Sequence, residues 1–231
     1  MAQRYLVPEL PPPGRHDVDG ELAHHLGRVL RARPGEAVRL GDGRGGSAPA
    51  TVIAVGRRTV TLEVGATTHS APASPALTVA FACPRASRCD WLIEHGTEVG
   101  IATFQPLWTR RSRPQQLRLD RWRTIARAAV GQCDRAHLPT LAEPVELSTL
   151  LASPGAGAHV LLDAGAPSLT GLAPTAAVTL LVGPEGGFDD DERAAIAAAG
   201  FAARCCGPHT LRTETAAVVA AAVVMALGAA S

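Results

Sequence analysis

Three short and almost entirely apolar segments constrain the fold of this chain more than any other feature. They lie at residues 78–83, 160–163 and 178–182, and segments with helical periodicity separate them. Strands that are apolar along their whole length are typical of sheets buried on both faces, and alternation with helices is typical of parallel sheets. The second part of the chain is therefore predicted to be an α/β domain.

The first part of the chain has shorter segments that are separated by turn residues. This pattern predicts strands at residues 4–7, 37–42, 50–55 and 59–64. Apolar side chains at helical spacing predict one helix over residues 21–31, which Pro34 and Gly35 would end. Short strands with one helix predict a small β-barrel.

The stretch over residues 65–76 is rich in Thr, Ser and Ala, contains two prolines and has neither helical nor strand periodicity. Such a composition is typical of a linker. We therefore expect two domains, one over residues 1–70 and the other over residues 75–231.

The arginines are unevenly distributed along the chain. The net charge is only +1, and all 22 basic residues are Arg. Residues 85–135 carry an excess of five positive charges, whereas residues 136–231 carry an excess of six negative charges. Clustered cations attract the phosphates of nucleic acids. The middle of the chain is therefore the predicted phosphate-binding region.

Three patterns argue against other classes of protein. The longest apolar run, residues 216–227, has 12 residues, whereas a helix that crosses a bilayer needs about 20. The N-terminal residues lack an apolar stretch of the length found in signal peptides. The five cysteines are odd in number and form no Cys-x-x-Cys pair, which argues against a disulfide framework and a structural zinc site. We expect a cytoplasmic protein without a membrane role or a metal.

A glycine-rich loop follows the third apolar segment. It reads Gly-Pro-Glu-Gly-Gly-Phe at residues 183–188, and acids occupy residues 189–192. Glycines allow the close approach of a ligand, and ligands of open α/β sheets bind beyond the carboxyl ends of the strands. The loop is also compatible with a simple turn from a strand into a helix. The acids disfavour a dinucleotide at this helix start and favour a cationic ligand without phosphate.

A second polar loop, residues 205–212, leads directly into the most apolar helix of the chain. Thr213 is predicted to cap this helix and Glu214 to be the acid of its first turn. Arg212 does not fit a capping role, because a cation next to a helix N-terminus opposes the helix dipole. We therefore expect Arg212 to have an anionic or polar ligand as its partner.

These two loops carry a resemblance to a known family. Residues 183–188 and the sequence Leu-Arg-Thr-Glu-Thr-Ala at residues 211–216 resemble the signature loops of SPOUT-class methyltransferases that methylate N3 of a uridine in small-subunit ribosomal RNA. Segments between residues 24 and 43 and between residues 91 and 139 are similar to the same family in order and spacing. The family's pattern is not followed at four positions, which are Arg85, His95, Gly131 and His209.

The resemblance covers essentially the whole chain and implies a fold. It implies a PUA-like RNA-binding β-barrel at residues 1–70 and a SPOUT α/β domain with a deep trefoil knot at residues 75–231. It also implies a homodimer that takes its methyl group from S-adenosylmethionine. The implied partner is small-subunit ribosomal RNA or the assembled small ribosomal subunit.

The same resemblance, with the loops and arginines above, indicates site residues. Those expected to bind the methyl donor are Leu181, Val182, Gly183, Glu185, Gly186, Gly187, Cys206, Gly207 and Leu211. Those expected to contact RNA, as one basic surface, are Arg4, His25, Arg28, Arg31, Arg44, Arg85, Arg110, Arg111, Gln132 and Arg135. Arg212 is expected to stabilise the uridine anion through its carbonyl oxygens. Glu214 or Glu185 is expected either to accept the proton or to have a structural role.

Two other functions are compatible with the sequence. One is methylation of a ribose 2′-hydroxyl by an enzyme of the same superfamily. The other is a non-catalytic RNA-binding factor for ribosome assembly that kept the fold. Both donor-side loops are retained, which favours catalysis, and a methyl-donor binding titration would distinguish an enzyme from such a factor.

Overall fold

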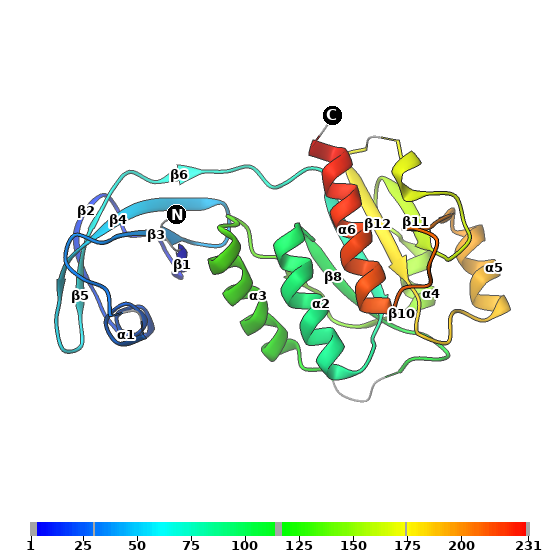
Figure 1. The fold of residues 1–231 in the computed structure, drawn as a ribbon, viewed down its shortest axis with the longest axis horizontal. Helices are drawn as coiled ribbons and strands as arrows, with labels where there is room; N and C mark the ends of the chain where they lie inside the picture. The colour runs from blue at the N-terminus through cyan, green and yellow to red at the C-terminus, as the bar shows by residue number, and fades with distance from the viewer. Residues whose placement is uncertain (1–3, 30, 114–116, 174, 230–231) are drawn as a thin grey trace. The chain divides into compact units, whose positions relative to one another are not determined.

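The computed structural model describes residues 4–29, 31–113, 117–173 and 175–229 (Figure 1). Its elements form two compact units, each with its own hydrophobic core. Unit 1 consists of Met1–Pro72 and Val130–Leu138, and unit 2 consists of Ala73–Ala129 and Pro139–Ser231.

Unit 1 is a six-stranded sheet with one short helical segment. Its strands are β1 (Arg4–Leu6), β2 (Gly14–Val18), β3 (Ala37–Gly41), β4 (Gly46–Val55), β5 (Val60–Val64) and β6 (Thr68–His69). They pair in the order β1-β3-β4-β5-β2, with β6 beside β4. The β1–β3 pair is parallel and the other pairs are antiparallel.

The four strands predicted in this part of the chain are confirmed. Alternating apolar side chains such as Leu40, Val52 and Leu62 are fully buried and build the core together with Leu26. β4 begins at Gly46, earlier than predicted. β2 and β6 are additional strands; β2 lies at an edge of the sheet, and its Arg, His and Asp residues leave no run of apolar alternation.

The predicted helix over residues 21–31 is found in part. The regular helix α1 (Gly20–His24) continues as a π-helical turn, η1 (His25–Val29). Arg31 lies beyond this turn and has a positive φ of 54°, a conformation that ends a right-handed helix.

A segment distant in sequence, Val130–Leu138, completes unit 1. Asp134 accepts a hydrogen bond from Arg4 at 2.9 Å and one from Arg39 at 2.6 Å. The end of the first part of unit 1, Pro72, falls within the expected linker, but this second segment lies outside the expected N-terminal domain. Ion pairs across 130 and 95 residues leave no local pattern in the sequence.

Unit 2 is an α/β unit in which every strand pair is parallel. Its strands are β7 (Ala76–Ala82), β8 (Thr103–Trp108), β9 (Thr140–Leu141), β10 (Val145–Glu146), β11 (Ala158–Leu162), β12 (Ala177–Val182) and β13 (Ala202–Arg204). Its helices are α2 (Ala86–Val99), α3 (Leu119–Cys133, of which the residues from Val130 belong to unit 1), α4 (Leu147–Ala152), the 3-10 turn η2 (Leu169–Gly171), α5 (Asp190–Ala198) and α6 (Thr213–Ala229). The strands pair in the order β10-β8-β7-β12-β11-β13, with β9 beside β8.

The sheet of unit 2 is buried on both faces, as its apolar strands predict. Leu77, Val79 and Phe81 of β7 are fully buried in the core cluster that includes α2 and α6. Ala80 of the same strand is fully buried in a second cluster, with Phe188 and with Ile196 of α5. Successive residues of a strand point to opposite faces, so the two clusters lie on the two faces of the sheet.

Helix α6 is the apolar helix expected from the sequence, and it packs beside α2 (Figure 1). The core side chains on its buried side are Ala217, Ala220, Ala221 and Val224. Such small residues let helices approach closely. None of the helices in the described ranges is long and apolar enough to cross a membrane.

Candidate functional site

A cavity of about 390 Å³ lies where three neighbouring strands of unit 2 end. β12, β11 and β13 are adjacent and parallel, so their carboxyl ends meet at one edge of the sheet. The lining includes Asp163 after β11, Gly183 and Glu185 after β12, and Gly207 and Arg212 after β13. The volume is within the range of small-molecule sites, about 300–1,000 Å³.

Seven of the nine residues expected to bind the methyl donor line this cavity. They are Val182, Gly183, Glu185, Gly187, Cys206, Gly207 and Leu211. Leu181 and Gly186 are not among the lining residues. Leu181 is fully buried in the core, and the carbonyl oxygen of Gly186 accepts a hydrogen bond from Arg111. The fold thus brings together two loops that are about twenty residues apart in the chain.

The loop after β11 is a third wall of the cavity that sequence reasoning missed. It contributes Asp163 and Ala164, next to Leu162 at the end of the strand. The strand itself is predicted, and Asp163 stands out as an acid directly after an apolar run. Its role depends on β11 lying between β12 and β13, and this sheet order has no signature in the local sequence.

The glycine-rich loop is fixed to the start of α6. A Cβ on Gly183 would lie 2.9 Å from the ring of Phe188, so this position requires glycine for packing within the loop. The helix begins at Thr213, whose hydroxyl donates to the carbonyl oxygen of Gly183 at 2.9 Å. The predicted capping role of Thr213 is therefore wrong, because an N-cap precedes the first helical residue, whereas Thr213 is itself that residue and its hydroxyl connects two cavity loops.

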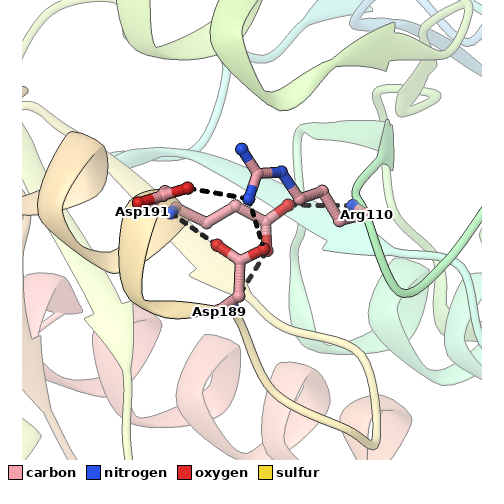
Figure 2. A network of polar contacts seen from close by, with 4 residues as sticks. Arg110, Asp189 and Asp191 are labelled. Carbon is pink, nitrogen blue, oxygen red and sulfur yellow. Dashed lines mark hydrogen bonds and ion pairs between the residues drawn. The ribbon is translucent and has the colours of Figure 1, made fainter.

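Carboxylates of the protein occupy the N-terminus of α5. Asp189 and Glu192 form a capping box, in which each side chain accepts from the other residue's amide. The Glu192 amide lowers the pKa of Asp189, and Arg110 donates to Asp189 and Asp191 at 2.9 Å each (Figure 2). With its amides and positive dipole satisfied in this way, the helix start is a poor phosphate site, as its acids predict.

Arg88 links the glycine-rich loop to the first turn of α6. Its Nη1 lies 2.9 Å from a carboxylate oxygen of Glu185, and its Nε lies 3.5 Å from Oε1 of Glu214. The Glu214 side chain is only 8% exposed, and its Oε2 is buried without a hydrogen-bond partner in the described structure. Glu214 is the expected first-turn acid of α6, and it also needs Arg88 as a counter-charge.

The two expected catalytic residues differ in their surroundings. Arg212 is exposed, lines the cavity and forms no ion pair with any described residue. Glu214 is buried and is not among the lining residues. Of the two carboxylates expected to accept a proton, Glu185 is the one that lines the cavity.

Two cysteines near the site, Cys89 and Cys206, lack the properties of nucleophiles. A hydrogen bond with Cys83, together with burial, raises the pKa of the Cys89 thiol far above its ordinary value. Burial also raises the pKa of Cys206, which lines the cavity. A thiol that stays protonated at neutral pH is a poor nucleophile, so neither group is suited to covalent catalysis.

Family models match both parts of the chain. The model described as an RNA methyltransferase domain matches residues 72–225, and that of an RNA methyltransferase PUA domain matches residues 18–65. The chain belongs to the RNA methyltransferase family. The family resemblance expected from the two loops is thereby confirmed.

Individual members of the RNA methyltransferase family are similar over nearly the whole chain. Ribosomal RNA small subunit methyltransferase E of Mycobacterium bovis is 35% identical, covering 97% of this chain and 91% of its own. The protein of the same name from Synechocystis is 33% identical, with 88% and 70% covered. The structure of ribosomal RNA small subunit methyltransferase E from Neisseria gonorrhoeae, bound to S-adenosyl methionine, is 28% identical, with a TM-score of 0.88 and 98% of both chains covered.

In this RNA methyltransferase family member, several arginines expected to contact RNA are engaged within the protein. Arg4 is only 6% exposed and is held by Asp134, so little of its side chain is available to RNA. Arg110 is held by the acids of α5. Burial lowers the pKa of Arg135, and Arg44 donates to the carbonyl oxygen of Pro8 at 3.2 Å.

The other residues expected to contact RNA have more open surroundings. Arg28, Arg31, Arg85, Arg111 and Gln132 are exposed. His25 is half-buried, with its ring tilted against that of Tyr5. In the described part of the chain, no group of three or more His, Cys, Asp or Glu side chains could hold a metal ion.

Gly207→Val is expected to weaken methyl-donor binding about tenfold. Gly207 has a φ of 141°, which L side chains rarely adopt, and the space around it is open, so strain alone would shift the loop. Calorimetric titration with S-adenosylmethionine measures the change. Gly200→Val is the matched control, because Gly200 has a φ of 82° in open space and does not line the cavity. Equal losses in the two variants would contradict this assignment.

Proposed function

We propose that this protein transfers a methyl group from S-adenosylmethionine to N3 of a uridine in small-subunit ribosomal RNA. The observation that carries the proposal is the cavity between two glycine-containing loops, with Arg212 on its wall and in no ion pair with any described residue. The names of the relatives support ribosomal RNA as the substrate. The bound S-adenosyl methionine of the Neisseria gonorrhoeae structure supports the methyl donor.

The residues that line the cavity fit this donor. Leu162, Val182 and Leu211 offer apolar surface for a purine ring, and the carboxylates of Asp163 and Glu185 suit hydroxyl groups and a cationic centre. The amides at the start of α5 are occupied by the capping box of the protein's own carboxylates, and S-adenosylmethionine carries no phosphate that would need a helix start. When bound, the donor supplies an electrophilic methyl group on a sulfonium.

The uridine has to lose its N3 proton as the new carbon–nitrogen bond forms and the carbon–sulfur bond breaks. The negative charge then spreads onto the two neighbouring carbonyl oxygens. Arg212 would donate to one of them with its planar guanidinium, which stabilises this charge most in the transition state. Glu185 lines the cavity and would accept the proton. Glu214 would have a structural role, because it forms an ion pair with Arg88, which also pairs with Glu185.

The proposal also includes the domain architecture, the oligomeric state and the cellular location. The expected domains at residues 1–70 and 75–231 would be a PUA-like β-barrel and a SPOUT domain with a deep trefoil knot. A homodimer is supported by α6, whose residues are apolar also on the side away from the core, as at Ala222 and Ala226. Ribosomal RNA or the assembled small ribosomal subunit would be met in the cytoplasm.

Methyl transfer in vitro tests the proposed function. The purified protein is incubated with methyl-labelled S-adenosylmethionine and either free small-subunit ribosomal RNA or the assembled subunit, and the digested nucleosides are separated. The proposal predicts labelled N3-methyluridine. A label on a ribose 2′-hydroxyl would show that the acceptor atom is the ribose oxygen and not uridine N3. Binding of S-adenosylmethionine without any methyl transfer would indicate a non-catalytic assembly factor.

A further inference from the structure

The regional charge of the chain is a poor guide to where its free cations lie. At least five of the ten arginines in the segment with the largest positive excess, residues 85–135, form ion pairs with acids of unit 2. These are Arg88, Arg110, Arg113, Arg121 and Arg123. A cation that already has a carboxylate partner gains less from a phosphate, because the partner must be released.

A surface hollow of about 650 Å³ in unit 1 gathers cations that have no such partners. Arg28, Arg57 and Arg58 line it together with His24 and Asp19. The three arginines are exposed, and no described acid forms an ion pair with them. The lining of this single hollow therefore contains three arginines and one acid.

The backbone holds these arginines at the hollow from two sides. The turn between β4 and β5 is closed by a hydrogen bond of 2.8 Å from the Gly56 amide to the Thr59 carbonyl oxygen, which places Arg57 and Arg58 at its tip. On the other side, Gly27 brings η1 so close to the hairpin that a Cβ would lie 3.3 Å from Val55 Cγ1. Arg28 follows directly in the same turn.

We propose that this hollow, lined by Arg28, Arg57 and Arg58, binds phosphates of the RNA backbone; the inference rests on the proposed function, in which RNA is the substrate. Guanidinium groups bind phosphate oxygens through paired hydrogen bonds. Phe, Tyr and Trp are absent from the described residues of the lining, where the imidazole of His24 is the one ring, so stacking of bases is not what this hollow favours. The contacts orient the RNA without reading its sequence. In the sequence, Arg57 and Arg58 stand between two predicted strands, so the sequence alone indicates only a hairpin turn at this place.

The double variant Arg57→Gln/Arg58→Gln tests the hollow in the full-length protein. Its affinity for a small-subunit ribosomal RNA fragment, measured by fluorescence anisotropy, is expected to fall at least about tenfold at about 0.1 M salt. The slope of log affinity against log salt is expected to flatten by about 0.7 to 0.9 for each lost phosphate contact. Affinity for S-adenosylmethionine is expected to remain unchanged, because none of these residues lines the donor cavity.

Two further variants separate local contacts from general charge. Arg15→Gln/Arg33→Gln removes the same charge from exposed positions of unit 1 outside the hollow and is expected to weaken binding less than threefold. Arg57→Lys/Arg58→Lys keeps both charges and is expected to retain most of the affinity. Equal losses in the two Gln variants, or an unchanged salt slope in the hollow variant, would overturn the proposal.

Methyl transfer measured in parallel distinguishes a failure of the proposed phosphate-binding hollow from a failure of the proposed function. If the wild-type protein methylates ribosomal RNA and the hollow variant keeps the same KM for RNA, the hollow is not the docking site and the proposed function stands. If RNA binding depends on the two arginines but no methyl is transferred, the hollow is supported and the proposed function fails.

Discussion

Arg212→Lys is expected to lower the single-turnover rate of methyl transfer by about two orders of magnitude, the scale seen when one oriented electrostatic donor is removed. Lysine keeps the charge but lacks the planar fork that would reach a uridine carbonyl oxygen. Arg212 lines the cavity without an ion pair to any described residue, so its charge is available to substrate. Affinity for S-adenosylmethionine is expected to change less than about threefold.

A matched variant shows whether the effect is specific. Arg127→Lys makes the same exchange at an exposed position of α3 that does not line the cavity, and it is expected to leave the rate unchanged. If Arg212→Lys weakens donor binding as much as it slows transfer, Arg212 binds the donor in the ground state and the assigned transition-state role is wrong.

Arg88→Gln is expected to reduce the free energy of unfolding by about 2 to 3 kcal/mol, because it leaves the Glu214 carboxylate buried without its counter-charge. This expected loss of stability lies at or below the lower end of the range found when one partner of a buried ion pair is removed, because the Arg88 side chain is 29% exposed. Urea unfolding followed by tryptophan fluorescence measures it, because Trp122 is buried in the core of unit 2.

The double variant Arg88→Gln/Glu214→Gln isolates this interaction. It removes the uncompensated charge, so it is expected to be more stable than Arg88→Gln alone. Arg85→Gln is the control near the same helix start, at an exposed arginine without an ion pair to any described residue. A double variant whose loss equals the sum of the single losses would show that Arg88 and Glu214 are not coupled.

Features that depend on local sequence could be predicted. Apolar runs such as residues 178–182 predict buried parallel strands, because a strand with no polar side needs cover on both faces. Gly183 and Gly207 mark the loops of the cavity, because the close contact with Phe188 at the first and the positive φ at the second both favour glycine. The acids at the start of α5 likewise exclude phosphate by their local effect on the helix dipole.

Features that depend on tertiary contacts could not be predicted. Arg88 reaches Glu185 across 97 residues of sequence, and Arg4 reaches Asp134 across 130. The sequence shows Arg4 and Arg110 as free cations, whereas the fold supplies both with carboxylates. Arg57 and Arg58, at the tip of the turn between β4 and β5, can be recognised as part of a hollow only in the folded structure, because residues of η1 line the same hollow.

The most direct test of the central claim is a map of modified nucleosides in ribosomal RNA from a strain that lacks this protein. Mass spectrometry of small-subunit ribosomal RNA is expected to show the loss of one N3-methyluridine, its return with the wild-type gene, and little return with the Arg212→Lys variant. An unchanged set of N3-methyluridines, or the loss of a ribose methyl group instead, would contradict the proposed reaction.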